Sequence, residues 1–185
     1  MPGHNPTIDG VVALIVPGIG NSGPRHWQTL WEQQHSQWRR VQQRDWDRPV
    51  CAEWLRGLDA AMAGLSAPPV LIAHSMGCLL VVHWAQRSSQ PVRAALLVAV
   101  PDPDGPCFPP AAQGFQPVPS ETLRFPSLVV ASSDDPFGSV TYARRCATDW
   151  GSAFAEVGPA GHINADSDLG DWPAGLALLE GLVKR

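Results

Sequence analysis

The chain has 185 residues, a net charge of −4, 44% hydrophobic residues and 16% charged residues. This length and composition predict one globular domain over residues 1–185, with a flexible start at residues 1–10. The 13 Lys and Arg residues form no cluster, which argues against nucleic acid or an acidic membrane as partner. No signal peptide and no membrane-spanning apolar run is visible, so the expected location is cytoplasmic.

Short aliphatic runs alternate along the chain with stretches of helical periodicity. Most of these runs are unbroken, which is typical of strands buried on both faces of a parallel sheet. The predicted strands are Val11–Val16, Arg40–Arg44, Val70–Ala73, Ala95–Val100, Leu128–Ser132 and Ala153–Val157. Strands that alternate with helices predict an α/β fold, a three-layer α/β/α sandwich with a mostly parallel sheet of about six strands.

Apolar residues that recur every three or four positions predict helices between these strands. The first expected helix places on one face Trp27, Leu30, Trp31, Gln34 and Trp38. The last expected helix begins behind Asp171, a plausible N-cap, and includes Trp172. The one long irregular stretch is Pro101–Pro126. The chain is too short for the helical lid domain that larger lipases insert, so a minimal fold without a lid is expected.

A nucleophile motif stands where the strand Val70–Ala73 meets a helix. The order is A-H-S-M-G with Ser75 in the middle, and an apolar helical run follows directly. Small residues two places before and after the serine let strand and helix crowd together around a strained turn, the nucleophile elbow. The motif Ser-x-Gly alone also occurs by chance, but this strand–helix context favours Ser75 as a nucleophile. The adjacent His74 is expected to pack beneath the turn.

A catalytic serine of this kind is followed along the chain first by an acid and then by a histidine. His162 is the only histidine downstream of Ser75, and it lies in a Gly-flanked loop after the last strand. The acid should follow the preceding strand, where Asp134 and Asp135 stand before Pro136. Proline holds the residue before it in extended geometry and helps to aim its carboxylate. Asp135 is therefore the predicted acid, with Asp134 kept as the alternative.

Two backbone N–H groups are needed to stabilise the oxyanion that forms when a serine attacks a carbonyl. One is expected from Met76, directly after the nucleophile, and the other from Ile19, in the Gly-rich loop after the first strand. In the same loop, Gly18 and Gly20 would let a substrate approach the backbone closely. Nucleotide binding by this loop is the weaker interpretation, because the loop lacks the Lys-Ser/Thr of a P-loop.

With these residues, the sequence resembles the small lidless α/β-hydrolases that include retinoblastoma-binding protein 9 and many bacterial relatives. The resemblance covers nearly the whole chain. Besides the elbow, it rests on V-P-G at 16–18, H-W at 26–27, Q-R-D-W at 43–46, D-P at 135–136, G-H-I-N at 161–164 and L-G-D-W-P at 169–173. The vertebrate member has an L-x-C-x-E motif for the retinoblastoma protein. Residues 49–53 read P-V-C-A-E and lack the leucine, so that binding is not expected here.

The resemblance implies a serine hydrolase without a metal or an organic cofactor. It also implies that Ser75, Asp135 and His162 occupy the matching catalytic positions. The expected reaction is acyl transfer to water through an acyl-enzyme, on a small-molecule acyl ester. The rival interpretation is a protein of the same fold that binds a partner without turnover, because fold alone does not prove activity.

Pocket walls are expected from aromatic residues near the predicted site. Phe108 and Phe115 lie in the irregular stretch after the fourth strand and could form the acyl side. Trp46 follows the second strand and should lie at the carboxyl edge of the sheet, where α/β proteins form their sites. Packing in the core is the alternative for all three residues.

Overall fold

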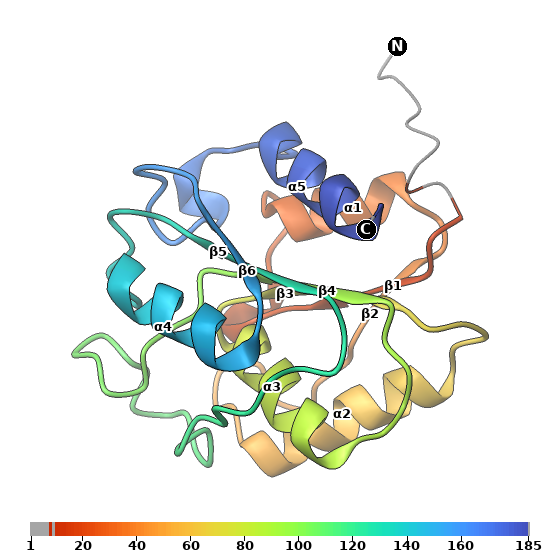
Figure 1. Cartoon of the computed structure of the whole chain (residues 1–185), viewed down its shortest axis with the longest axis horizontal. Helices are drawn as coiled ribbons and strands as arrows, with labels where there is room; N and C mark the ends of the chain where they lie inside the picture. The colour runs from red at the N-terminus through yellow and green to blue at the C-terminus, as the bar shows by residue number, and fades with distance from the viewer. Residues whose placement is uncertain (1–7, 9, 185) are drawn as a thin grey trace.

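Six parallel strands form one sheet, in the order β2-β1-β3-β4-β5-β6 (Figure 1). The computed structural model describes residue 8 and residues 10–184, so the predicted flexibility of residues 1–10 falls mostly outside the described residues. The strands are β1 (Ala13–Val16), β2 (Trp38–Arg40), β3 (Val70–His74), β4 (Ala94–Val98), β5 (Ser127–Ala131) and β6 (Ala153–Glu156). Because all the pairings are parallel, the carboxyl ends of the strands lie at one edge of the sheet.

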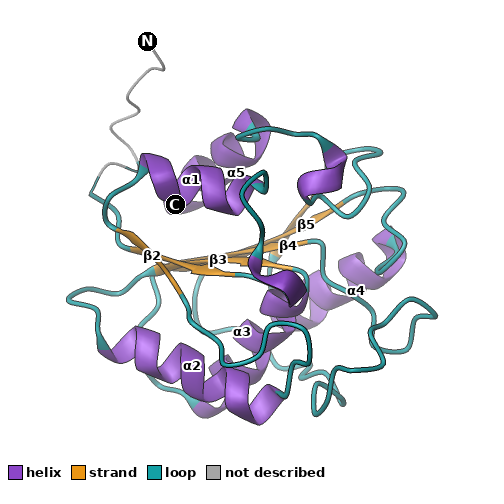
Figure 2. Ribbon diagram, turned by 180° about the vertical axis from the view of Figure 1, so that it is seen from behind, coloured by secondary structure: helices purple, strands orange, loops and turns teal. Residues whose placement is uncertain are grey.

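Helices cover both faces of this sheet (Figures 1 and 2). On one face lie α1 (Trp27–Gln34) and α5 (Pro173–Val183), and on the other α2 (Cys51–Ala63), α3 (Met76–Arg87) and α4 (Val140–Trp150). Two short 3₁₀ turns, η1 (Ile19–Asn21) and η2 (Ala165–Ser167), belong to loops at the carboxyl edge. The predicted three-layer α/β/α sandwich with six strands is confirmed.

The four inner strands, β1, β3, β4 and β5, are buried along their whole length. Successive side chains point to opposite sides of the sheet, so both faces of these strands are covered. In β1, Leu14 and Val16 belong to the core under α2, α3 and α4, whereas Ala13 and Ile15 belong to the core under α1 and α5. The same alternation holds in β3. Two cores explain why the strands are unbroken aliphatic runs in the sequence. They also hold the carboxyl edge, and therefore its loops, on a rigid base.

The second strand lies earlier in the chain than predicted. β2 is Trp38–Arg40 and overlaps the predicted strand Arg40–Arg44 by a single residue. Trp38, which was expected on the first helix, therefore belongs to β2. The helix ends before His35, whose backbone is extended at φ −127° and ψ 100°. Trp38 then packs beside Trp31, with ring centroids 6.2 Å apart, so its core position is reached from a strand rather than from a helix.

The last helix begins one residue later than predicted. Its N-cap is Trp172 rather than Asp171, and Pro173 occupies the first helical position. Trp172 has a left-handed backbone, with φ 45° and ψ 68°, and its indole is buried against Trp27 and Trp31. Proline suits the first helical position because it needs no N–H partner there. Burial of the Trp172 ring, and not a side-chain capping bond, sets the start of α5.

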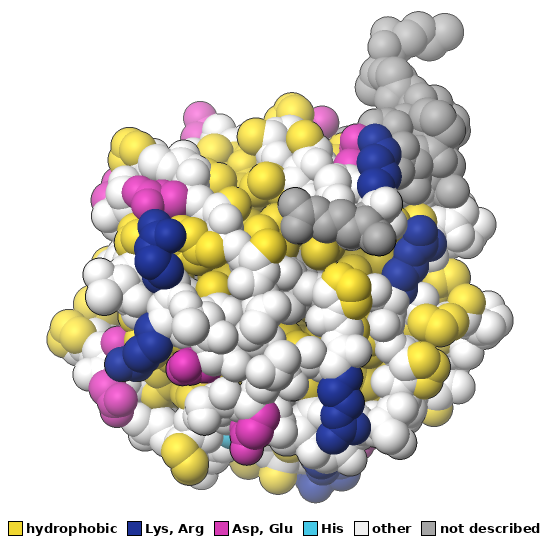
Figure 3. Space-filling model, in the orientation of Figure 1, with side chains coloured by type: hydrophobic (Ala, Val, Ile, Leu, Met, Phe, Trp, Pro, Cys, Tyr) yellow, Lys and Arg dark blue, Asp and Glu magenta, His cyan; other side chains and the backbone are white. Residues whose placement is uncertain are grey.

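Charged side chains are dispersed over the face of the molecule that Figure 3 shows, with Lys and Arg interspersed among Asp and Glu. Within residues 8 and 10–184, no helix combines the length and the apolar character needed to cross a bilayer. The same part of the chain contains no group of three or more His, Cys, Asp or Glu side chains arranged to hold a metal ion.

Candidate active site

The candidate site lies at the carboxyl edge of the sheet, beside β1 and β3. The chain passes from β1 to β2 in one direction and from β3 to β4 in the other, so the loops after β1 and β3 diverge. Such a switch point leaves a crevice beyond the strand ends, and α/β proteins bind ligands in this crevice. The loops after β1, β3, β4, β5 and β6 all contribute residues to a cavity here.

Ser75 joins β3 to α3 through a strained turn. Its backbone has φ 56° and ψ −126°, a region that residues with a side chain rarely adopt. A Cβ at Gly77 would lie 2.1 Å from the carbonyl oxygen of Val16, so only glycine lets α3 approach β1 this closely. At Gly18, a Cβ would lie 2.9 Å from the Cβ of Ser75. The local geometry is that of a nucleophile elbow, with the serine at the N-terminus of a helix.

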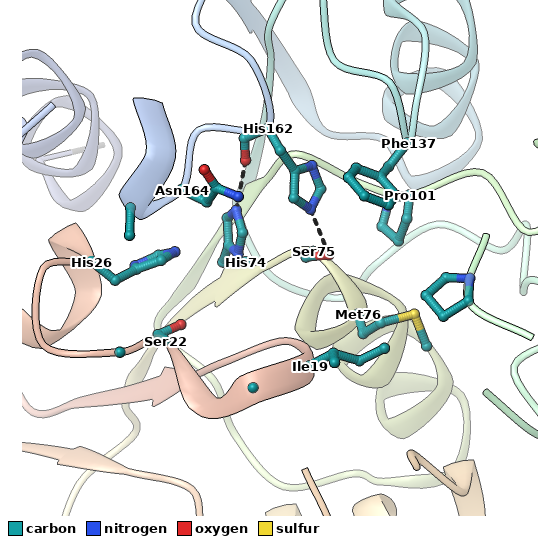
Figure 4. Close-up of a pocket in the computed structure, with 14 residues that line it drawn as sticks. Ile19, Ser22, His26, His74, Ser75, Met76, Pro101, Phe137, His162 and Asn164 are labelled. Carbon is teal, nitrogen blue, oxygen red and sulfur yellow. Dashed lines mark hydrogen bonds between the residues drawn. The ribbon is translucent and has the colours of Figure 1, made fainter. Parts of the chain in front are cut away.

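The structure brings Ser75, His162 and Asp135 into one line of hydrogen bonds. His162 Nε2 lies 2.8 Å from Ser75 Oγ (Figure 4), and His162 Nδ1 lies 2.9 Å from each carboxylate oxygen of Asp135. Since a carboxylate only accepts, Nδ1–H donates to Asp135 and leaves the Nε2 lone pair to accept the serine O–H. The Asp135 side chain is 2% exposed and that of His162 10%, so bulk water is kept from this pair.

The neighbouring aspartate makes different contacts. Asp134 Oδ1 accepts from Ser132 Oγ and from the N–H of Gly161, both at 2.8 Å. These two hydrogen bonds lower the pKa of the exposed Asp134 carboxyl, because they stabilise its charged form. They also tie the loop after β5 to the loop that carries His162. Asp134 therefore connects these two loops, and it does not contact the His162 ring.

Two buried histidines lie beside His162. His74 donates from Nε2 to the main-chain carbonyl of His162 at 2.8 Å (Figure 4). His26 packs edge-on against His74, with ring centroids 4.6 Å apart. Burial lowers the pKa of His26 to about 3 and holds the pKa of His74 well below its ordinary value, so both rings are neutral at pH 7. The expected packing of His74 beneath the elbow is observed, together with its bond to the His162 loop.

The Gly-rich loop after β1 forms another wall of the site. The N–H of Gly20 donates to the carbonyl oxygen of Trp46 at 3.2 Å, and that of Asn21 donates within the loop at 3.3 Å, so both amides hold the loop in shape. Ile19 lines the cavity together with Met76 and is 38% exposed. The amides of Ile19 and Met76 stay the predicted oxyanion donors.

A cavity of about 310 Å³ lies against Ser75 (Figure 4). One end is apolar and is lined by Ile19, Met76, Pro101 and Phe137 (Figure 4). The other end carries the polar side chains of Ser22, His26, His74 and Asn164. Ser75 and His162 lie between these two groups, so a bound molecule would meet the serine with a different environment on each side.

The predicted aromatic walls lie elsewhere, and the cavity as the described residues line it includes none of them. Trp46 packs edge-on against Trp54, with ring centroids 5.5 Å apart, and its carbonyl oxygen accepts the N–H of Gly20 in the Gly-rich loop. Phe108 is half-buried against the core under α2, α3 and α4, and Phe115 is buried in that core. The pocket role predicted for Trp46 and Phe108 is thus replaced by core packing, because each large ring finds apolar partners inside the molecule.

Several residues that line the cavity were not predicted from the sequence, among them Phe137, Pro101, Asn164 and His26. Phe137 follows Asp135 by two residues, and the centroids of the Phe137 and His162 rings are 4.4 Å apart. Pro101 is the first residue of the irregular stretch after β4. Asn164 follows His162 by two residues, and His26 belongs to the H-W pair at 26–27 on which the family resemblance rests. Phe137 and Asn164 could have been predicted because each lies two residues after the expected acid or base.

Similarity to known proteins extends over most of the chain. The serine hydrolase family model matches residues 13–181. A YdeN-like hydrolase from Pectobacterium atrosepticum is 31% identical, with a TM-score of 0.83, over 94% of this chain and 91% of that one. The ydeN gene product of B. subtilis is 19% identical, with a TM-score of 0.80, over 94% and 98% of the two chains. No curated protein matches the chain.

A thermophilic esterase from Thermogutta terrifontis is also similar in structure, at 18% identity and a TM-score of 0.68, over 95% of this chain and 90% of that one. At identities this low, the likeness to the esterase and to the B. subtilis protein supports the α/β-hydrolase fold alone. The family match and the 31% identical hydrolase also support a hydrolytic enzyme. The chain belongs to the serine hydrolase family.

Proposed function

We propose that this serine hydrolase is a carboxylesterase that cleaves small acyl esters through an acyl-enzyme on Ser75. The observation that carries the proposal is the line of hydrogen bonds from Ser75 through His162 to the buried Asp135, beside a cavity. Acyl transfer needs a nucleophile, a base within hydrogen-bond reach and a group that orients this base. A cavity of about 310 Å³ suits a small substrate.

In the first half of the reaction, Ser75 Oγ attacks the ester carbonyl and its proton passes to His162 Nε2. The carbonyl oxygen becomes an oxyanion, which the amides of Ile19 and Met76 stabilise with their N–H groups. Asp135 holds the His162 ring by Nδ1 and balances the imidazolium that forms. When the tetrahedral intermediate collapses, the alcohol leaves with the proton from Nε2 and the acyl group stays on Ser75.

In the second half, water takes the place of the alcohol. His162 Nε2 accepts a proton from the water as its oxygen attacks the acyl carbon, and the same two amides stabilise the second oxyanion. Collapse returns the proton to Ser75 Oγ and releases the carboxylic acid. In each half of the reaction, His162 accepts one proton and gives it back, so the protons balance with only the substrate and water as reactants.

Labelling with a fluorophosphonate tests this proposal, together with hydrolysis of a panel of acyl esters, thioesters and amides. Only an activated serine reacts with the probe, so a labelled Ser75 and turnover of short esters are the expected results. The rival function, a binding protein of this fold without turnover, predicts neither labelling nor hydrolysis. Turnover of thioesters or amides in place of esters would keep the serine chemistry and replace the substrate class.

The rate of ester hydrolysis is expected to rise with pH through one ionisation. His162 must be neutral to accept the serine proton, and histidine side chains exchange their protons between about pH 5 and 8. The pKa of His26 is about 3 and that of His74 is also lowered, so neither of these rings titrates in this window. The measurement is kcat/KM on one ester from pH 5 to 8. A flat profile would argue against a histidine base.

The hydrogen bond from His74 to the His162 carbonyl is expected to support the rate as a positioning contact. His74→Leu should lower kcat by roughly ten- to a hundredfold with little change in KM, because a base misplaced by about 1 Å loses much of its effect. His74→Gln retains an N–H at similar reach and should recover most of the lost rate. The two variants are compared by kcat and KM on the same ester. Equal losses in both would mean that ring packing, and not this bond, is what matters.

A further inference from the structure

The two ends of the cavity differ in what they offer a ligand (Figure 4). At the apolar end, Met76, Pro101 and Phe137 present only hydrocarbon and a thioether. At the other end stand the polar side chains of Ser22, His26, His74 and Asn164. Of the residues that line the cavity, the esterase reaction uses Ser75, His162 and the two amides, while His74 positions the His162 loop. The other polar groups at this end have no role in that reaction.

Two of these polar groups already donate their protons in hydrogen bonds within the protein. Ser22 Oγ donates to the side-chain oxygen of Gln28 at 2.6 Å, and His74 Nε2 donates to the carbonyl oxygen of His162 at 2.8 Å. His26 accepts the N–H of Gln28 on Nδ1, so in the neutral ring Nε2 carries the proton. That atom is buried and has no partner among the described residues, and such groups call for a functional explanation.

Asn164 is the polar residue whose donors stay open to the cavity. Its Oδ1 accepts the N–H of Asp166 at 3.0 Å and caps η2, which fixes the orientation of the amide. The Nδ2 group therefore points away from the cap and lies on the side of His74 (Figure 4), and Asn164 lines the cavity. Nδ2 donates no hydrogen bond to the described residues, whose bonds to Asn164 use its backbone N–H and Oδ1. A ligand atom at this end thus meets N–H donors and should itself be an acceptor.

The acceptor that fits this end is uncharged. The described residues that line the cavity include no Lys or Arg, and both histidines at this end are neutral at pH 7. Burial of a carboxylate against neutral donors alone is costly, because its charge would stay unpaired. An ether, hydroxyl or carbonyl oxygen avoids this cost.

The position of His162 indicates which part of the ester reaches Asn164. Nε2 must hand its proton to the leaving alcohol oxygen, so that oxygen lies next to the His162 ring. Asn164 stands two residues further along the same loop and lines the same cavity. We propose that the polar end binds an uncharged oxygen in the alcohol part of the ester, with Asn164 Nδ2 as the donor, while the acyl group occupies the apolar end. This specificity rests on the proposed esterase function.

The test compares two esters of equal size, n-butyl butyrate and 2-methoxyethyl butyrate, which differ only by one CH₂ replaced with oxygen in the alcohol part. The ratio of their kcat/KM values, corrected for their rates of hydrolysis by hydroxide, measures the preference. Asn164→Ser keeps a good N-cap and replaces the amide N–H donors with a hydroxyl on a shorter side chain that does not reach the same ligand atom. The preference for the ether oxygen should then fall about fivefold, the worth of one neutral hydrogen bond. Asn164→Asp keeps the shape and the cap without the donors, and should also lose the preference.

Ser167→Ala is the matched control. Ser167 belongs to the same capping box, and its Oγ accepts the N–H of Asn164 at 3.1 Å, but the residue does not line the cavity. This change weakens the loop and leaves the donors of Asn164, so it should alter the two rates together and keep their ratio. A ratio that falls as far as in Asn164→Ser would mean that loop structure, and not the donor, sets the preference, and would overturn the proposal.

A second pair, n-butyl pentanoate and n-butyl 3-methoxypropanoate, moves the oxygen into the acyl part. No preference that depends on Asn164 is expected for this pair, and one seen only here would overturn the assignment of the two ends. Equal ratios in the wild type and in Asn164→Ser would also overturn the proposal, while hydrolysis and labelling of Ser75 would keep the esterase function standing. Absence of hydrolysis of any ester would remove the proposed function and the specificity together.

Discussion

Ser75→Ala is expected to lower the rate of ester hydrolysis about 10⁶-fold and to abolish labelling by a fluorophosphonate. The effect is this large because the attacking atom is lost, and the base and acid that remain have no nucleophile to activate. The fold should persist, since alanine keeps the Cβ of Ser75 and meets the same strain at φ 56°. Intact mass after labelling, kcat on a short ester and the thermal unfolding midpoint are the three measurements.

Ser133→Ala is the control for this variant. Ser133 follows β5 on the same edge of the sheet, is exposed and does not line the cavity, so its loss should leave labelling and kcat unchanged. Labelling that survives in Ser75→Ala, at Ser133 or Ser22, would show that another serine is the nucleophile.

Asp135→Asn is expected to lower kcat by up to about 10⁴-fold while the protein stays folded. Both carboxylate oxygens of Asp135 lie 2.9 Å from His162 Nδ1, and the carboxylate holds the proton on that nitrogen. An amide in its place can donate to Nδ1 and thereby move the ring proton to Nε2, where the proton blocks acceptance from Ser75. The measurement is kcat on one ester, with the far-ultraviolet circular dichroism spectrum as a check on folding.

Asp134→Asn provides the matched comparison, one residue away and with the same chemical change. Asp134 contacts Ser132 and Gly161 instead of the His162 ring, and an asparagine oxygen can still accept from both. Its loss of kcat should stay within about tenfold, as for an exposed residue outside the chemistry. If Asp134→Asn lowered kcat strongly and Asp135→Asn only slightly, the acid would be Asp134 and the assignment of Asp135 would be wrong.

The placement of the helix after β5 supports this distinction. Ser139 caps α4 by accepting the N–H of Tyr142 at 3.1 Å, so Asp135 is not needed as a cap. A serine directly before a helical stretch is the sequence pattern typical of such a cap. Asp135 Oδ1 accepts the N–H of Phe137 at 2.9 Å, and both carboxylate oxygens of Asp135 lie 2.9 Å from His162 Nδ1. Pro136 follows Asp135 and favours an extended backbone at that residue.

The prediction for Trp38 was wrong because one spacing of tryptophans fits two different structures. Tryptophans four and seven positions apart, as at Trp27, Trp31 and Trp38, fit one face of a helix, yet such residues can also reach one core from a helix and from the strand beside it. Trp31 lies on α1 and Trp38 on β2, and both rings pack in the core under α1 and α5. Similarly, Trp46 and Phe108 lie at the correct edge of the sheet by their place in the chain. Their rings pack against residues of the core under α2, α3 and α4. The spacing of residues in the sequence does not predict this packing.

The sequence by itself determined the alternation of strands and helices, the α/β class, the elbow at Ser75 and the order of acid and histidine after it. These follow from residues close together in the chain, because periodicity, small residues around a strained turn and proline geometry act locally. Only the tertiary structure decided that His74 holds the His162 loop and that the cavity has a polar and an apolar end. The residues responsible come from five loops after five different strands, and their contacts depend on how those loops meet at the sheet edge.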